Sequence, residues 1–187
     1  RQLVVHRDLK PSNIMVDAAG RVRLLDFGIA KLLDDTEAHA THTDVRVLTP
    51  AYAAPEQIRG EPVSTATDVY ALGVVAFELL AGRLPHRRTA RGATELLAAL
   101  AGESTESPST AAGRLAASAA DAGRADRLRR AARALAGDLD QILLTALRPE
   151  PQRRYPSVDA FAADLERFLA GRPVAARRDT LSYRMRR

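Results

Sequence analysis

The chain has 187 residues, no cysteine, a formal net charge of +5 and 46% hydrophobic residues. This apolar content is enough for one ordinary folded domain, and the lack of cysteine excludes disulfides and thiolate metal sites. Six arginines against one aspartate between 172 and 187 account for the positive balance. Because tryptophan is absent and other aromatic residues are few, we expect no nucleic-acid partner.

The motif HRDLKPSN occupies residues 6–13, between the apolar runs 3–5 and 14–16. We expect a tight loop between two short buried strands that directs its polar side chains into one pocket. Such groups suit phosphoryl transfer, in which positioning and charge neutralisation contribute more than covalent chemistry. Asp8 could accept the proton of an attacking hydroxyl and Lys10 could steady phosphoryl oxygens. Asn13 could offer its carbonyl oxygen to Mg²⁺, which prefers oxygen ligands.

Residues 14–25 predict a β-hairpin, with Gly20 in the turn at the position that needs a positive φ. Asp26 follows the second strand directly, and Gly28 lets the backbone turn sharply two residues later. An Asp-x-Gly turn is common after any strand. With Asn13 upstream at a suitable distance, however, Asp26 is the better candidate for a metal ligand.

Helices are predicted by periodicity and by their end signals. The strongest is residues 64–82, which Ser64 or Thr65 can cap and Gly82 ends, and its apolar residues run nearly all round, as in a buried helix. Further helices are predicted at 94–101, 124–136, 138–147 and 157–169. Residues 102–123 are rich in Ala, Ser, Thr and Gly and predict a flexible insertion. Residues 172–187 have too few apolar residues for a stable element.

The order of the motifs resembles the protein kinase family. After HRDLKPSN come Asp26-Phe27-Gly28, Ala54-Pro55-Glu56, the stretch 68–73 that begins with Asp68, and Arg154, all at kinase-like spacing. The resemblance implies an α+β, mainly helical fold: a partial kinase large lobe over residues 1–171, with a short β-hairpin at the catalytic loop. Residues 172–187 would then be a basic tail or juxtamembrane linker.

The resemblance also implies roles in catalysis. Asp8 would be the base, Lys10 the electrostatic stabiliser, and Asn13 and Asp26 the magnesium ligands, with ATP and Mg²⁺ (or Mn²⁺) as cofactors. Met15 would touch the underside of the adenine, although it could equally fill the core. Thr49 matches the threonine that hydrogen-bonds the catalytic Asp and Lys in serine/threonine kinases.

Other residues have implied structural or regulatory roles. His6, Phe27 and Gly28 belong to the two loop motifs. Arg7 could pair with a phosphate on the activation segment, residues 26–56, where the candidate acceptors are Thr36, Thr41 and Thr43 unless these are ordinary solvated residues.

Two carboxylates have predicted structural partners. Glu56 and Arg154 would form a buried salt bridge, the alternative being two independent surface charges. Asp68 would accept hydrogen bonds from the catalytic-loop backbone, or simply favour the helix N-terminus.

The chain contains neither a Gly-x-Gly-x-x-Gly loop nor a Val-Ala-Ile-Lys strand. We therefore expect a fragment without the N-terminal lobe, partly molten and with little activity alone. The first functional hypothesis is a serine/threonine kinase that transfers the γ-phosphate of ATP to proteins. The alternative is a pseudokinase or truncated, non-catalytic protein-interaction module. With no leader or membrane span visible, we expect a cytoplasmic location, any membrane tether lying outside this chain.

Overall fold

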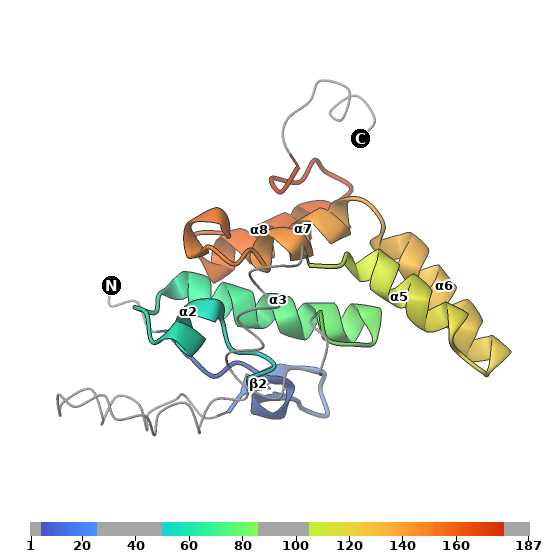
Figure 1. Cartoon of the computed structure of the whole chain (residues 1–187), viewed down its shortest axis with the longest axis horizontal. Coiled ribbons are helices and arrows are strands. Elements are labelled where there is room, and N and C mark those ends of the chain that lie inside the picture. The colour runs from blue at the N-terminus through green and yellow to red at the C-terminus, as the bar shows by residue number, and fades with distance from the viewer. Residues whose placement is uncertain (1–4, 26–49, 86–104, 178–187) are drawn as a thin grey trace.

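The computed structural model describes residues 5–25, 50–85 and 105–177. Within these ranges the protein is mainly helical with one two-stranded sheet, as predicted. Helix α3 (Thr65–Ala81) lies at the centre, with α7 (Asp138–Ala146) and α8 (Val158–Leu169) on one side and the β-hairpin on the other (Figure 1). The helix predicted at 94–101 lies outside the described residues. None of the described helices has the length and hydropathy needed to cross a bilayer.

Helix α3 forms as its end signals predicted. The Ser64 hydroxyl accepts the N–H of Ala66, and Gly82 ends the helix in the left-handed conformation with φ of 75°. Its core face carries four large side chains that are each at most 1% exposed: Val69, Tyr70, Val74 and Phe77. The prediction of burial on every side fails in the last turn, where Leu79 and Leu80 are exposed. This helix therefore supplies the rigid support on which the N-terminal loop rests.

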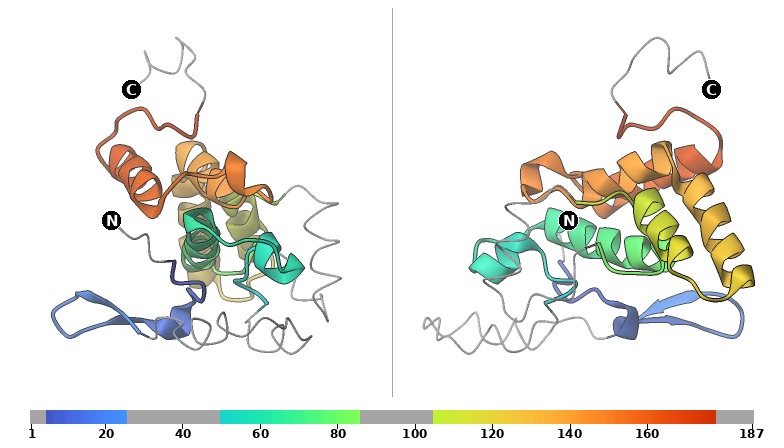
Figure 2. Two further views of the ribbon diagram at one scale, coloured as in Figure 1. Left: turned by 90° about the vertical axis from the view of Figure 1, so that its left-hand side faces the viewer. Right: turned by 45° about the vertical axis from the view of Figure 1, so that its right-hand side comes forward.

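The hairpin pairs β1 (Ile14–Val16) with β2 (Val22–Leu24) in antiparallel register, Met15 opposite Arg23. Gly20 has the expected positive φ of 77°. The two strands are not buried, contrary to our expectation for the strand after the loop, because the hairpin projects from the helices (Figure 2). Met15 is 54% exposed and so does not fill the core of the described residues.

Residues 108–117 of the predicted flexible insertion form a helix, which corrects that prediction, whereas the next helix matches the one predicted at 124–136. Helix α5 (Pro108–Ala117) packs along α6 (Ala122–Leu135), and together they extend from one end of α3 (Figure 1). The carboxylate of Asp140 on α7 accepts the N–H and the hydroxyl of Ser109, which supports the start of α5. Ala111 and Ala112 are completely buried. Alanine is weakly apolar, so the sequence pattern did not reveal this packing.

The chain after α8 folds back onto the helices as far as residue 177, so the boundary predicted after 171 is also corrected. The buried carboxylate of Asp164 accepts the Tyr155 hydroxyl at 2.7 Å and the backbone N–H groups of Ala175 and Ala176 at 2.6 and 2.9 Å. Burial and the neighbouring Asp164 raise the pKa of Tyr155, so its hydroxyl keeps the proton that it donates. Val174 is 3% exposed within the core.

The crossing of α3 and α7 is close enough to exclude a side chain at Gly73. A Cβ there would lie 3.0 Å from the Cβ of Ala146. We expect Gly73→Ala to lower the free energy of unfolding by about 1–3 kcal/mol through overpacking. In α5, a Cβ on Gly113 would meet nothing within 4 Å, and Gly113→Ala should raise stability by about 0.5–1 kcal/mol through helix propensity. Chemical denaturation followed by circular dichroism tests both, and equal effects would contradict the close crossing.

Candidate active site

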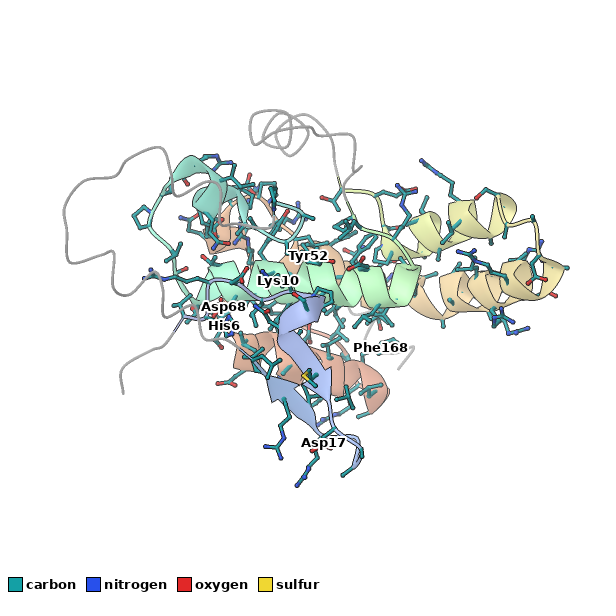
Figure 3. The ribbon with its side chains drawn as sticks, turned by 90° about the horizontal axis from the view of Figure 1, so that it is seen from below. His6, Lys10, Asp17, Tyr52, Asp68 and Phe168 are labelled. Carbon is teal, nitrogen blue, oxygen red and sulfur yellow. The ribbon has the colours of Figure 1, made fainter. Side chains whose placement is uncertain are left out.

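The N-terminal loop is held by the first turn of α3. The backbone N–H groups of His6 and Arg7 donate to the two carboxylate oxygens of Asp68 at 2.8 and 3.0 Å. Figure 3 shows His6, Lys10 and Asp68 gathered beside α3, whereas Asp17 lies at the far tip of the hairpin. The predicted hydrogen bonds from the loop backbone to Asp68 are thus present. Because Asp68 is only 7% exposed, its position is set by the packing of α3.

Three polar side chains of the loop meet in one cluster. The Lys10 ammonium lies 2.9 Å from the Asp8 carboxylate, and the Asn13 amide nitrogen donates to the backbone oxygen and the carboxylate of Asp8 at 2.8 and 3.1 Å. The 3₁₀ turn η1 (Pro11–Asn13) brings Asn13 back towards Asp8. Asp8 is 34% exposed, so its carboxylate can be reached from solvent while two donors orient it.

The amide orientation of Asn13 leaves its carbonyl oxygen for another role. Both hydrogen bonds to Asp8 use the amide nitrogen, and the amide oxygen accepts only a long 3.5 Å hydrogen bond from the Ser12 hydroxyl among the described residues. The Leu25 N–H donates to the backbone oxygen of Asn13 at 2.8 Å, so the end of the hairpin lies beside Asn13. A side-chain carbonyl oxygen is a ligand of the kind that Mg²⁺ takes. Among the described residues alone, no group of three His, Asp or Glu could hold a metal.

The segment 50–56 is fixed to the rest of the fold by a buried ion pair. Arg154 donates to both carboxylate oxygens of Glu56 at 2.7 and 2.8 Å, although the residues are far apart in sequence, as predicted. Thr67 adds a third hydrogen bond to Glu56, and the Arg154 guanidinium lies over the ring of Tyr70. Burial raises the pKa of the Glu56 carboxyl, but the hydrogen bonds and charge of Arg154 outweigh it. The pKa therefore lies below its usual value, and Glu56 is ionised at neutral pH.

Two contacts were not anticipated from the sequence. The Tyr52 hydroxyl donates to Glu78 on α3 at 2.6 Å, which fixes the start of this segment. Gln57, in helix α2 (Pro55–Arg59), donates from its amide to the backbone oxygen of Arg7 at 2.8 Å. Its place at the third position of a short helix is typical of a capping residue, but no local pattern points to a loop fifty residues away.

Several predicted site residues lie outside the described residues. They are Asp26, Phe27, Gly28, Thr36, Thr41, Thr43 and Thr49. Met15 is described, and its exposed side chain on β1 leaves it accessible to a ligand.

A comparison with known families settles what kind of domain this is. The model of the protein kinase domain matches residues 1–162. This chain belongs to the protein kinase family. Protein kinases as a family use ATP and Mg²⁺ and act on proteins. The family also explains why the ordered motifs, and not overall composition, were the informative part of the sequence.

Relatives of this chain include bacterial kinases. It is 34% identical over 175 residues to the serine/threonine-protein kinase PknB of Mycobacterium tuberculosis, an alignment that covers 92% of this chain and 24% of the relative. The probable serine/threonine-protein kinase PknB of Bifidobacterium longum is 34% identical over 177 residues, an alignment that covers 94% of this chain and 22% of the relative. A probable serine/threonine-protein kinase of Corynebacterium efficiens is 36% identical over 163 residues, and this alignment covers 87% of this chain and 22% of the relative. The chain thus spans about a quarter of the length of the curated relatives it matches.

Proposed function

We propose that the full-length protein is a bacterial serine/threonine protein kinase that transfers the γ-phosphate of ATP to hydroxyl groups of protein substrates. The cluster of Asp8, Lys10 and Asn13, fixed to α3 through Asp68, is the observation that supports this. A carboxylate that is oriented by two donors yet open to solvent suits a base that must receive a proton from an incoming hydroxyl.

Each residue of the cluster has a separate task. Asp8 accepts the proton as the substrate oxygen bonds to phosphorus and the bond to the bridging oxygen breaks. Lys10, 2.9 Å from Asp8, neutralises charge on the phosphoryl oxygens, which are the main site of charge in such transition states. When bound, Mg-ATP supplies the phosphoryl group and the cation that neutralises its charge.

Nucleotide and metal would be held by residues on both sides of the hairpin. The side-chain oxygen of Asn13, together with Asp26, is the proposed Mg²⁺ ligand pair, and Mn²⁺ has the same ligand preference. Met15 offers an exposed apolar side chain on β1 for the adenine. Lys10 and Thr49 together favour serine and threonine over tyrosine as acceptors.

Regulation by phosphorylation is part of the proposal. Arg7, beside the base, would pair with a phosphate on Thr36, Thr41 or Thr43, because a guanidinium binds phosphate through paired hydrogen bonds. We also propose a cytoplasmic location, where ATP is available, with any membrane tether outside this chain.

Replacing Asp8 with asparagine should reduce phosphoryl transfer by at least about a hundredfold, because the general base is lost while the side-chain shape is kept. The measurement is intact mass of the full-length protein after incubation with Mg-ATP and a protein substrate. The wild type should gain mass in steps of one phosphate.

An exposed aspartate on α6, Asp126, provides the matched control, and Asp126→Asn should behave as the wild type. If neither the wild type nor the Asp8 variant gains phosphate while both bind nucleotide, the protein is instead a non-catalytic interaction module.

A further inference from the structure

The side chain of Gln57 joins two segments that the proposed function uses. Its amide nitrogen donates to the backbone oxygen of Arg7 at 2.8 Å, and its amide oxygen accepts the backbone N–H of Ala54 at 3.0 Å. Ala54 lies at the end of the activation segment, and Arg7 immediately precedes the proposed base. Helix α2, which carries Gln57, lies beside the start of α3, so it can reach the loop (Figure 1).

The chemistry of these partners requires an amide at position 57. A backbone N–H can only donate and a backbone carbonyl can only accept, so the oxygen of Gln57 must face Ala54 and its nitrogen must face Arg7. In the reversed orientation the Gln57 NH₂ group would face the N–H of Ala54, and its oxygen would face the carbonyl of Arg7, so neither hydrogen bond could form. An ionised carboxylate could keep the first bond but not the second, and an apolar side chain could make neither.

The bond to Arg7 acts next to the proposed base. Arg7 has a φ of 68°, in the left-handed region that non-glycine residues rarely adopt and that surrounding contacts must maintain. Asp68 holds the N–H of Arg7, and Gln57 holds its carbonyl. Since a peptide unit is planar, fixing this carbonyl fixes the N–H of Asp8 in the same plane. That N–H otherwise makes a long 3.4 Å contact to His6 Nδ1.

We propose that Gln57 is a positioning residue for catalysis. It sets the peptide plane between Arg7 and Asp8, and thereby the direction of the Asp8 carboxylate. Through Ala54 it also couples that direction to the end of the activation segment. This inference rests on the proposed kinase function.

Steady-state kinetics of the full-length protein with Mg-ATP and a peptide substrate test the proposal. Gln57→Met keeps the side-chain length but loses both hydrogen bonds, and kcat should fall about 10- to 100-fold, as expected for a misplaced catalytic group. The KM for ATP should stay within about twofold, because Gln57 contacts the loop upstream of the proposed nucleotide and metal ligands. Gln141, exposed on α7, is the matched control, and Gln141→Met should leave both constants unchanged.

The pH dependence of Gln57→Glu separates positioning from packing. An ionised glutamate cannot donate to the Arg7 carbonyl, whereas a protonated glutamate can donate there and still accept from Ala54. The ratio of kcat in this variant to kcat in the wild type should therefore rise severalfold as the pH falls from about 8 to about 6, since a carbonyl oxygen beside the carboxyl favours its protonated form. Taking the ratio removes those effects of pH on kcat that both proteins share.

The outcomes distinguish this inference from the proposed function. A wild type that transfers no phosphate overturns both. An active wild type with an unchanged kcat in Gln57→Met, or with a pH-independent ratio in Gln57→Glu, overturns the positioning role and leaves the kinase function intact. A fall in kcat with a rising ratio at low pH supports both.

Discussion

Arg154→Met should lower the free energy of unfolding by about 3–5 kcal/mol, the largest effect on stability that we expect from a single substitution. Among the described residues, the Arg154 guanidinium is the one cation that forms an ion pair with the Glu56 carboxylate, and both side chains are at most 2% exposed. Removing it leaves a charge buried without compensation. It also leaves the backbone oxygens of Ala66, Arg148 and Pro149 without a hydrogen bond from this side chain. Denaturant or thermal unfolding measures the loss.

The neighbouring Arg153 provides the control for this variant. Its side chain is 67% exposed, and its guanidinium lies 3.7 Å from the Glu150 carboxylate. Arg153→Met should therefore lower the free energy of unfolding by no more than about 1 kcal/mol. Adding Glu56→Gln to Arg154→Met should recover part of the lost stability, because the uncompensated charge is then absent. Equal losses in the two arginine variants would show that the ion pair is not a main support of the fold.

Asp68→Asn should reduce kcat by about a hundredfold in a folded protein. The two carboxylate oxygens of Asp68 each accept one N–H of the loop, from His6 and from Arg7. Asparagine offers one oxygen and one NH₂ group, so one loop N–H would face another donor. The loop would lose one of its two hydrogen bonds to α3, and stability should fall by about 1–3 kcal/mol. Peptide phosphorylation and thermal unfolding are measured on the same preparation.

The alternative explanation for Asp68, a favourable charge at a helix N-terminus, has its own control. Asp159 lies in the first turn of α8 and is exposed. Asp159→Asn should cost at most about 0.3–1 kcal/mol, the usual size of the helix-dipole effect, and leave kcat unchanged. If Asp68→Asn matches it in both respects, the loop does not depend on this carboxylate.

Local features of the fold could be read from the sequence because they depend on neighbouring residues. Ser64 and Ser157 each accept a backbone N–H at the start of the helix that was predicted after them. Gly20 and Gly82 adopt the positive φ angles expected at a turn and a helix end. Capping and turn formation act over three or four residues, so the local sequence contains all the partners.

The site was only partly predictable for the same reason. The cluster of Asp8, Lys10 and Asn13 lies within one short motif, and the kinase resemblance supplied the distant partners Asp68 and Arg154. Gln57 had no such motif, since its partner Arg7 is fifty positions away and the bond depends on how α2 packs beside the loop. The roles of the residues between 26 and 49 remain predictions.

The sequence by itself determined helices α3, α6, α7 and α8, the hairpin and the family, because these depend on local spacing and on motifs in a fixed order. Only the tertiary structure decided that α5 replaces a flexible insertion and that residues 172–177 pack against the helices. In both places the local sequence is weakly apolar, and the backbone is held by hydrogen bonds to distant carboxylates. Asp140 accepts the N–H of Ser109, and Asp164 accepts the N–H groups of Ala175 and Ala176. A buried carboxylate is costly unless it accepts hydrogen bonds. The packing of the whole fold determines which donors lie close enough to supply them.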